Sequence, residues 1–269
     1  MRNAVVEVGQ STLSALRGLG RLTQFALSIL YWGLTGLPPR RILMPVMYDI
    51  GVRSVPVVLV TGSFVGMVLA VQMYSQLRSL GAQNAAGVII NVSMVKELGP
   101  VLAAVILAGR VGGAMAAELG TMRVTEQIDA LSTMGADPIR YLVLPRFLAT
   151  LLLTPILTVF SDAIGVLGGW LVSTQALPIN SFFYWENTRE ILKAWDIWVG
   201  IIKSFFFGGL IGLISCYKGF TCGPGAQGVG RATTLAFVTT FVSILVSNFF
   251  LAVLLRHIYN YFLSPSAIR

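Results

Sequence analysis

Five long apolar stretches, each almost free of charged side chains, constrain this chain more than any other feature of its sequence. They lie between Arg53 and Arg78, between Arg78 and Arg110, from Arg146 to about Gln175, between Asp196 and Lys218, and between Arg231 and Arg256. A helix needs about 20 mostly apolar residues to cross the hydrocarbon core of a bilayer. The stretches therefore predict an all-α integral membrane protein with five transmembrane helices.

Composition supports this prediction and excludes several classes of protein. Only 11% of the 269 residues are charged, whereas a soluble domain carries about 25% charged residues. The single histidine, His257, and the two cysteines, Cys216 and Cys222, do not form the clusters that zinc sites or catalytic triads need. We therefore expect no catalytic residues, no metal and no cofactor in this chain.

The basic residues predict the orientation of the chain in the membrane. Of 19 lysines and arginines, 12 flank one side, five flank the other and two lie within apolar stretches. Because basic residues favour the cytoplasmic side, this bias predicts a cytoplasmic N-terminus and a C-terminus on the outer side of the membrane, with residues 263–269 as a short tail on that side. The chain has no run of like charges, so a nucleic-acid partner is not expected.

Residues 1–50 differ in character from the rest of the chain. Between Val5 and Leu37 apolar side chains recur with helical spacing, and Pro38-Pro39 ends the pattern. We interpret this segment as an amphipathic helix that lies along the cytoplasmic membrane interface. A sixth, poorly formed crossing is the alternative.

The polar segment between Arg110 and Arg146 contains a predicted short helix. The residues from Thr125 onward favour a helix that Gly135 ends. Ile128, Leu131 and Met134 form an apolar stripe at a spacing of three residues. Such a stripe with acidic edges suits docking into a groove of a partner protein, and packing beneath its own bundle is the alternative. The residues that we expect to couple to the partner are Arg123, Glu126, Ile128, Asp129 and Leu131.

Charged residues inside the apolar stretches form the candidate site. Lys96 and Glu97 interrupt the second stretch, where a charge costs about 2.5–3.5 kcal/mol on insertion scales. Adjacent residues project about 100° apart on a helix, so these two cannot fully satisfy one another. Lys203 in the fourth stretch is the expected partner of Glu97, and Asp196 lies seven residues before Lys203 on the same helical face.

The glycine-rich segment that begins at Gly223 carries no nucleotide-binding signal. Its G-x-G-x-x-G pattern follows an apolar stretch instead of a strand and contains Pro224, so we expect a tight turn. The chain also lacks the G-x-x-x-x-G-K-[ST] pattern of a phosphate-binding loop. Any ATP-driven step would therefore need a separate ATPase.

Three blocks of sequence resemble the MlaE/YrbE permease family of MCE-type lipid ABC transporters. They are KELGPVLAAVILAGRVGGAMAAELGTMRVTEQIDAL from Lys96 to Leu131, GADPIRYLVLPR from Gly135 to Arg146, and GPGAQGVGRATT from Gly223 to Thr234. The resemblance extends from about Gly51 to Phe262. It implies a five-helix permease domain over residues 51–262, preceded by an amphipathic segment over residues 1–50.

The resemblance also implies the partners of the chain. It implies a homodimeric permease in the bacterial inner membrane, a separate cytoplasmic ABC ATPase that binds ATP with Mg²⁺, and a periplasmic MCE-domain lipid-binding protein. The cargo would be phospholipid. The alternatives are an ion-coupled secondary lipid transporter, for which we find no internal repeat, and a lipid-modifying enzyme, which needs clustered His or Asp residues.

The charges inside the membrane then have two possible roles. Glu97 and Lys203, with Lys96 and Asp196, line a lipid cavity near the dimer axis, or they form a structural ion pair between helices. Leu69 and Leu77 are candidates for contact with acyl chains, although ordinary lipid-facing positions explain them equally well. Asp162 lies near several glycines, and we expect it to serve helix packing with one polar contact.

Overall fold

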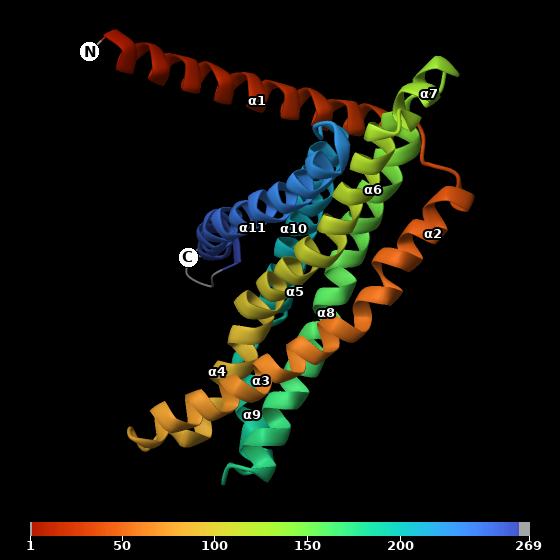
Figure 1. The fold of residues 1–269 in the computed structure, drawn as a ribbon. Helices are drawn as coiled ribbons and strands as arrows, with labels where there is room; N and C mark the ends of the chain where they lie inside the picture. Colours follow the sequence, from red (N-terminus) through yellow and green to blue (C-terminus); the bar gives the residue numbers. More distant parts are fainter. Residues whose placement is uncertain (1, 264–269) are drawn as a thin grey trace.

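Five helical segments that are long and apolar enough to cross a membrane form the body of the protein (Figure 1). The computed structural model describes residues 2–263. Its candidate spans are Arg40–Arg78, Ala86–Val124, Ile139–Gln175, Ala194–Phe220 and Gly225–Tyr261. The prediction of an all-α membrane protein with five spans is confirmed.

Several spans are built from more than one helical element. The first consists of α2 (Arg40–Ile50), the 3-10 turn η1 (Val52–Ser54) and α3 (Val55–Arg78). The second consists of α4 (Ala86–Ser93), the π-helical turn η3 (Met94–Leu98), α5 (Gly99–Leu107), a second π-helical turn η4 (Ala108–Gly112) and α6 (Gly113–Val124). The third combines the π-helical turn η5 (Ile139–Val143) with α8 (Leu144–Gln175).

The remaining spans and the connecting elements complete the chain. The fourth span is α10 (Ala194–Phe220), and the fifth is α11 (Gly225–Ile258), which continues into the π-helical turn η6 (Tyr259–Leu263). Outside the spans lie α1 (Arg2–Thr35), η2 (Gln83–Ala85), α7 (Gln127–Thr133) and α9 (Ser181–Ile191). Residues 264–269 of the expected C-terminal tail lie outside the described residues.

The first span begins earlier than the sequence predicts. The charge-free stretch starts after Arg53, but the helical segment already starts at Arg40. The helix continues past its charges because Asp49 and Arg53, one turn apart, form an ion pair of 3.0 Å. α2 also packs against α8, so the expected boundary at residue 50 falls inside this segment.

α1 lies across one end of the bundle instead of running along it (Figure 1). Its C-terminal half is anchored there by Phe25 and Ile29, which are buried. The ring of Phe25 lies 5.6 Å from that of Tyr217 and 5.8 Å from that of Phe220. α1 is not among the five candidate spans of the described chain, so a sixth crossing finds no support, and the interfacial location of α1 stays a prediction.

Glycines allow α3 and α8 to approach closely. A side chain at Gly66 would place its Cβ 1.9 Å from the carbonyl oxygen of Gly165, and one at Gly62 would lie 2.8 Å from that of Ser161. Small residues at such spacing let membrane helices pack backbone against backbone. These contacts fix the position of the third span beside the first.

Asp162 of α8 packs in the same way against α5. A Cβ on Gly99 would lie 1.5 Å from Asp162 Oδ1, so only glycine fits at that position. Asp162 Oδ1 is buried and has no hydrogen-bond partner within the part of the chain that is described. Close helix packing is therefore present, but the expected polar contact is not found at this oxygen.

The glycine-rich segment forms the predicted tight turn. Gly225 has a φ of 74°, which favours glycine. A Cβ on Gly228 would lie 2.1 Å from the carbonyl oxygen of Gly223. The turn connects α10 directly to α11.

Candidate functional site

The second span changes its helical geometry where its two charges lie. The π-helical turn η3 contains Lys96 and Glu97, and Pro100 follows it. Proline has no N–H group, so the carbonyl oxygen of Lys96, four residues earlier, lacks its usual α-helical donor. Lys203 Nζ donates a hydrogen bond to that oxygen over 3.2 Å. The proline thus frees an acceptor that helps to position Lys203.

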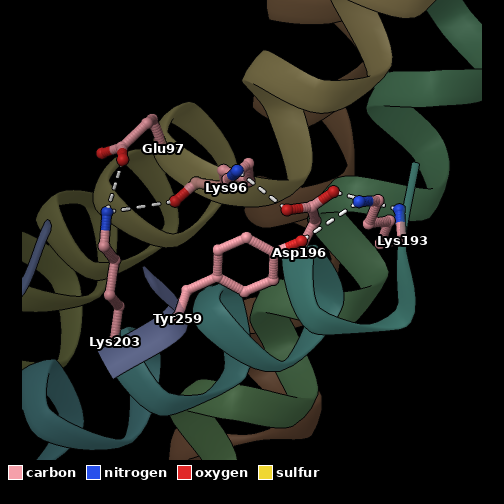
Figure 2. Close-up of polar contacts among 6 residues, drawn as sticks. All are labelled: Lys96, Glu97, Lys193, Asp196, Lys203 and Tyr259. Carbon is pink, nitrogen blue, oxygen red and sulfur yellow. Dashed lines mark hydrogen bonds and ion pairs between the residues drawn. The ribbon is translucent and has the colours of Figure 1, made fainter. Parts of the chain in front are cut away.

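The predicted ion pair between Glu97 and Lys203 is present. Lys203 Nζ lies 2.7 Å from Glu97 Oε1, as Figure 2 shows. The side chain of Lys203 is fully buried, whereas that of Glu97 is 46% exposed. Asn248 of α11 donates a hydrogen bond to the other oxygen of Glu97 over 3.3 Å. The pair therefore connects the second, fourth and fifth spans.

Lys96 has a partner of its own. Its Nζ lies 2.8 Å from Asp196 Oδ1, so each of the adjacent charges pairs with a different residue of α10. Asp196 Oδ2 also accepts a hydrogen bond from the backbone N–H of Lys193 over 3.0 Å, which caps the start of α10. Asp196 is thereby fixed against the second span.

Lys193 extends this polar network to the end of the fifth span (Figure 2). Its Nζ donates a hydrogen bond to Tyr259 Oη over 3.1 Å. This bond raises the pKa of Lys193 above its usual value. Lys193 is exposed and lies between α9 and α10, outside the spans.

Part of this network lines a cavity of about 710 Å³, but the buried Lys203, predicted as a cavity residue, does not belong to the lining. The charged lining consists of Lys96, Glu97, Lys193, Asp196 and Arg256, and the apolar lining includes Val199, Phe249, Val253 and Leu255. Lys96 is 37% and Glu97 46% exposed, so both can meet a ligand. Such a cavity can bind an amphipathic molecule, with a charged group at one wall and apolar chains along the other.

Leu69 and Leu77 lie elsewhere. Both pack against a separate cluster of buried residues that includes Tyr74, Ile90 and Tyr184. The structure does not bring them to the lining of the charged cavity. Their contact with acyl chains stays a prediction.

α7 confirms the predicted short helix, with Gly135 just beyond its end at a φ of 78°. Glu126, immediately before α7, has a φ of 61°, the only positive φ of a non-glycine residue in the described chain. Arg123 NH1 lies 2.5 Å from Asp129 Oδ1 and ties α7 to the end of α6. The residues expected to couple to a partner therefore lie together, on α7 and at the end of α6.

The apolar stripe of α7 divides between two environments. Ile128 is only 2% exposed, Leu131 is half-buried and Met134 is 82% exposed. A spacing of three residues falls about 60° short of a full helical turn, so the stripe drifts around the helix. Ile128 packs beneath its own bundle, the alternative left open by the sequence, and Leu131 and Met134 remain available to a partner.

Three residues that shape the site, Lys193, Asn248 and Pro100, were not predicted from the sequence. Asn248 is the single amide side chain between Arg231 and Arg256, and this was the available signal. Pro100 lies four residues after Lys96, and that spacing alone predicts an acceptor without its helical donor.

Comparison with known proteins gives the class to which this bundle belongs. The chain is 46% identical over 214 residues to a probable ABC transporter permease protein of Rickettsia typhi, covering 80% of this chain and 83% of that protein. It is 43% identical over 219 residues to a probable ABC transporter permease protein of a Synechocystis species, covering 81% and 83%. The protein is therefore an ABC transporter permease, a transport component.

The family within that class is also defined. The family described as Permease MlaE matches residues 43–254. The intermembrane phospholipid transport system permease protein MlaE of Haemophilus influenzae is 34% identical over 258 residues, 94% of this chain and 97% of that protein. This chain belongs to the MlaE permease family.

Proposed function

We propose that this chain is the membrane subunit of an ABC transporter that moves phospholipid between the bacterial inner membrane and a periplasmic MCE-domain protein. The observation that carries the proposal is the fully buried Lys203, paired with the half-exposed Glu97 in the wall of an amphipathic cavity. A charge within the membrane is costly and marks a site of function. The name of the Haemophilus relative supports phospholipid as the cargo.

The cavity offers each part of a phospholipid a matching surface. The ammonium groups of Lys96 and Lys193 suit the phosphate of the headgroup. Phe249, Val253 and Leu255 of α11 suit the acyl chains. In this proposal Glu97 contacts the headgroup, and the buried Lys203 acts through its ion pair with Glu97 to hold the second, fourth and fifth spans in the arrangement that keeps the cavity open.

The proposed partners bind at opposite ends of the bundle. The ATPase, which binds ATP with Mg²⁺, docks on α7 at the cytoplasmic end, and the MCE-domain protein receives lipid at the periplasmic end. A second copy of the chain completes the cavity on the side of α11, where the lining residue Phe249 is 65% exposed. Inside a bilayer such an association rests on close packing of side chains, because lipid tails are as apolar as these residues.

The energy source separates this proposal from its alternatives. In proteoliposomes that contain this protein, its ATPase and a fluorescent phospholipid, we expect lipid movement that requires ATP. An ATPase variant lacking its phosphate-binding lysine is the control, and it should reduce movement to the level of protein-free vesicles.

Two results would contradict the proposal. Lipid movement driven by an ion gradient without ATP would identify a secondary transporter. Chemically altered lipid in the same vesicles, detected by mass spectrometry, would identify a lipid-modifying enzyme.

A further inference from the structure

A second charged cavity lies between the first three spans, toward the end of the bundle that carries α7. It has a volume of about 390 Å³ and is lined by α2, the turns η1 and η4, α6 and the start of α8. It shares no lining residue with the cavity around Lys96. Figure 1 shows α2 and α11 on opposite sides of the bundle, so the two cavities face different directions.

The charges of this second cavity do not balance. It is lined by three arginines and two carboxylates: Arg53, Arg110, Arg146, Asp49 and Glu118. Arg53 pairs with Asp49 over 3.0 Å, and Arg146 pairs with Glu118 over 3.1 Å. Over the described residues no carboxylate lies within ion-pair distance of Arg110. The excess positive charge of the cavity therefore resides on Arg110.

The guanidinium of Arg110 is held through one of its terminal nitrogens. Its NH1 donates a hydrogen bond to Ser54 Oγ. Ser54 is fully buried, and its own hydroxyl donates to the carbonyl oxygen of Ile50 over 2.5 Å, so it serves Arg110 as an acceptor. A guanidinium carries five N–H donors in a planar fork. The donors that remain are available to a ligand in the cavity.

The surroundings of Arg110 suit a lipid better than a free ion. The guanidinium lies in the π-helical turn η4, within a candidate membrane span. The cavity that it lines also contains Val46, Ile50, Val111 and Met115. A cation without a carboxylate partner is costly beside hydrocarbon, and the headgroup of an anionic membrane lipid supplies a matching charge. Basic pockets between transmembrane helices bind anionic headgroups, and guanidinium groups bind phosphate with two parallel hydrogen bonds.

We propose that this cavity binds the phosphate of an anionic phospholipid through Arg110, at a site separate from the transport cavity. The lipid belongs to the leaflet on the α7 side, which is the cytoplasmic leaflet in the orientation of the proposed function. Arg53 and Arg146, already paired, flank the phosphate, and the apolar walls contact the glycerol and upper acyl chains. This lipid holds the first span against the second and third.

Native mass spectrometry of the complex tests the site. The protein, purified with its native partners, is exposed to phosphatidylglycerol, to phosphatidylcholine or to inorganic phosphate. We expect the wild type to retain phosphatidylglycerol in preference to phosphatidylcholine, and Arg110→Gln to weaken this retention about fivefold. Arg78→Gln, at an exposed arginine at the opposite end of α3, is the matched control and should behave as the wild type.

Three outcomes would overturn the proposal. They are equal retention by Arg110→Gln and the wild type, equal retention of the two lipids, and displacement of the lipid by inorganic phosphate. If Arg110→Gln does not fold, Arg110→Lys keeps the charge but loses the fork, and it should show an intermediate loss. ATP-dependent lipid movement is read separately, so failure of the proposed function does not decide this site.

Discussion

Lys203→Glu should abolish phospholipid movement and strongly destabilise the protein. The substitution places a second carboxylate against Glu97 and leaves the carbonyl oxygen of Lys96 without its donor. Breaking a buried ion pair from one side costs about 3–5 kcal/mol. The measurement is the thermal unfolding midpoint in detergent together with ATP-dependent lipid movement. Arg78→Glu, an exposed charge reversal, is the control and should change neither.

The exchanged pair, Glu97→Lys with Lys203→Glu, separates structure from cargo binding. We expect only part of the stability to return, because a lysine at position 97 cannot accept from Asn248 and a glutamate at position 203 cannot donate to the Lys96 carbonyl. Transport should stay low in the protein that folds, because the headgroup then meets a wall of altered charge. Full recovery of transport by the exchanged pair would show that a structural ion pair is sufficient.

A double variant without either charge tests cargo binding separately from protein stability. In Glu97→Gln with Lys203→Met, both charges are removed together, which is often neutral for stability. Loss of charged hydrogen bonds to the headgroup should still slow lipid movement about tenfold or more. Wild-type transport by this variant would contradict a role of the charges in cargo binding.

Leu131→Asp and Glu126→Lys should each release the ATPase. Leu131 is half-buried on α7, which the ion pair between Arg123 and Asp129 holds in place. Glu126 is exposed immediately before this helix. Losing a central contact of an interface costs about 2 kcal/mol or more, which weakens binding about thirtyfold. Copurification of the ATPase with the tagged permease measures this loss, and membrane insertion should be unchanged.

Leu80→Asp is the matched control for the coupling helix. Leu80 is 76% exposed and follows the opposite end of α3, away from α7, so its replacement should leave ATPase copurification intact. Ile128→Asp should differ from both, because Ile128 is buried and its replacement disrupts α7 itself. Unchanged copurification of Leu131→Asp and Glu126→Lys would exclude α7 as the docking helix.

The charges within the membrane made the main features of the site predictable. An apolar span offers a charge few partners, so the pairing of Glu97 with Lys203 followed from position and sign alone. The same reasoning placed Asp196 on the face of α10 that meets the second span, where it pairs with Lys96. The few charges within the spans therefore predict which distant residues pair, whereas the apolar residues do not.

The remaining features depend on geometry that no local pattern contains. The π-helical turn η3 alters the direction in which the side chains of Lys96 and Glu97 point. Asn248 donates a hydrogen bond to Glu97 from 151 positions further along the sequence. The link from Trp32 Nε1 to Asp137 Oδ2, which joins α1 to the segment after α7, likewise spans 105 positions. Leu69 and Leu77 could not be placed from the sequence, because an apolar residue in a span can equally well pack against another helix or contact lipid.

The most direct test of the account is purification of this protein with its native partners, followed by mass spectrometry of bound lipids and copurifying chains. We expect bound phospholipid that is lost in the neutral variant of Glu97 and Lys203, together with an ABC ATPase and an MCE-domain protein. A complex without phospholipid, or one whose phospholipid content does not depend on these two residues, would contradict it.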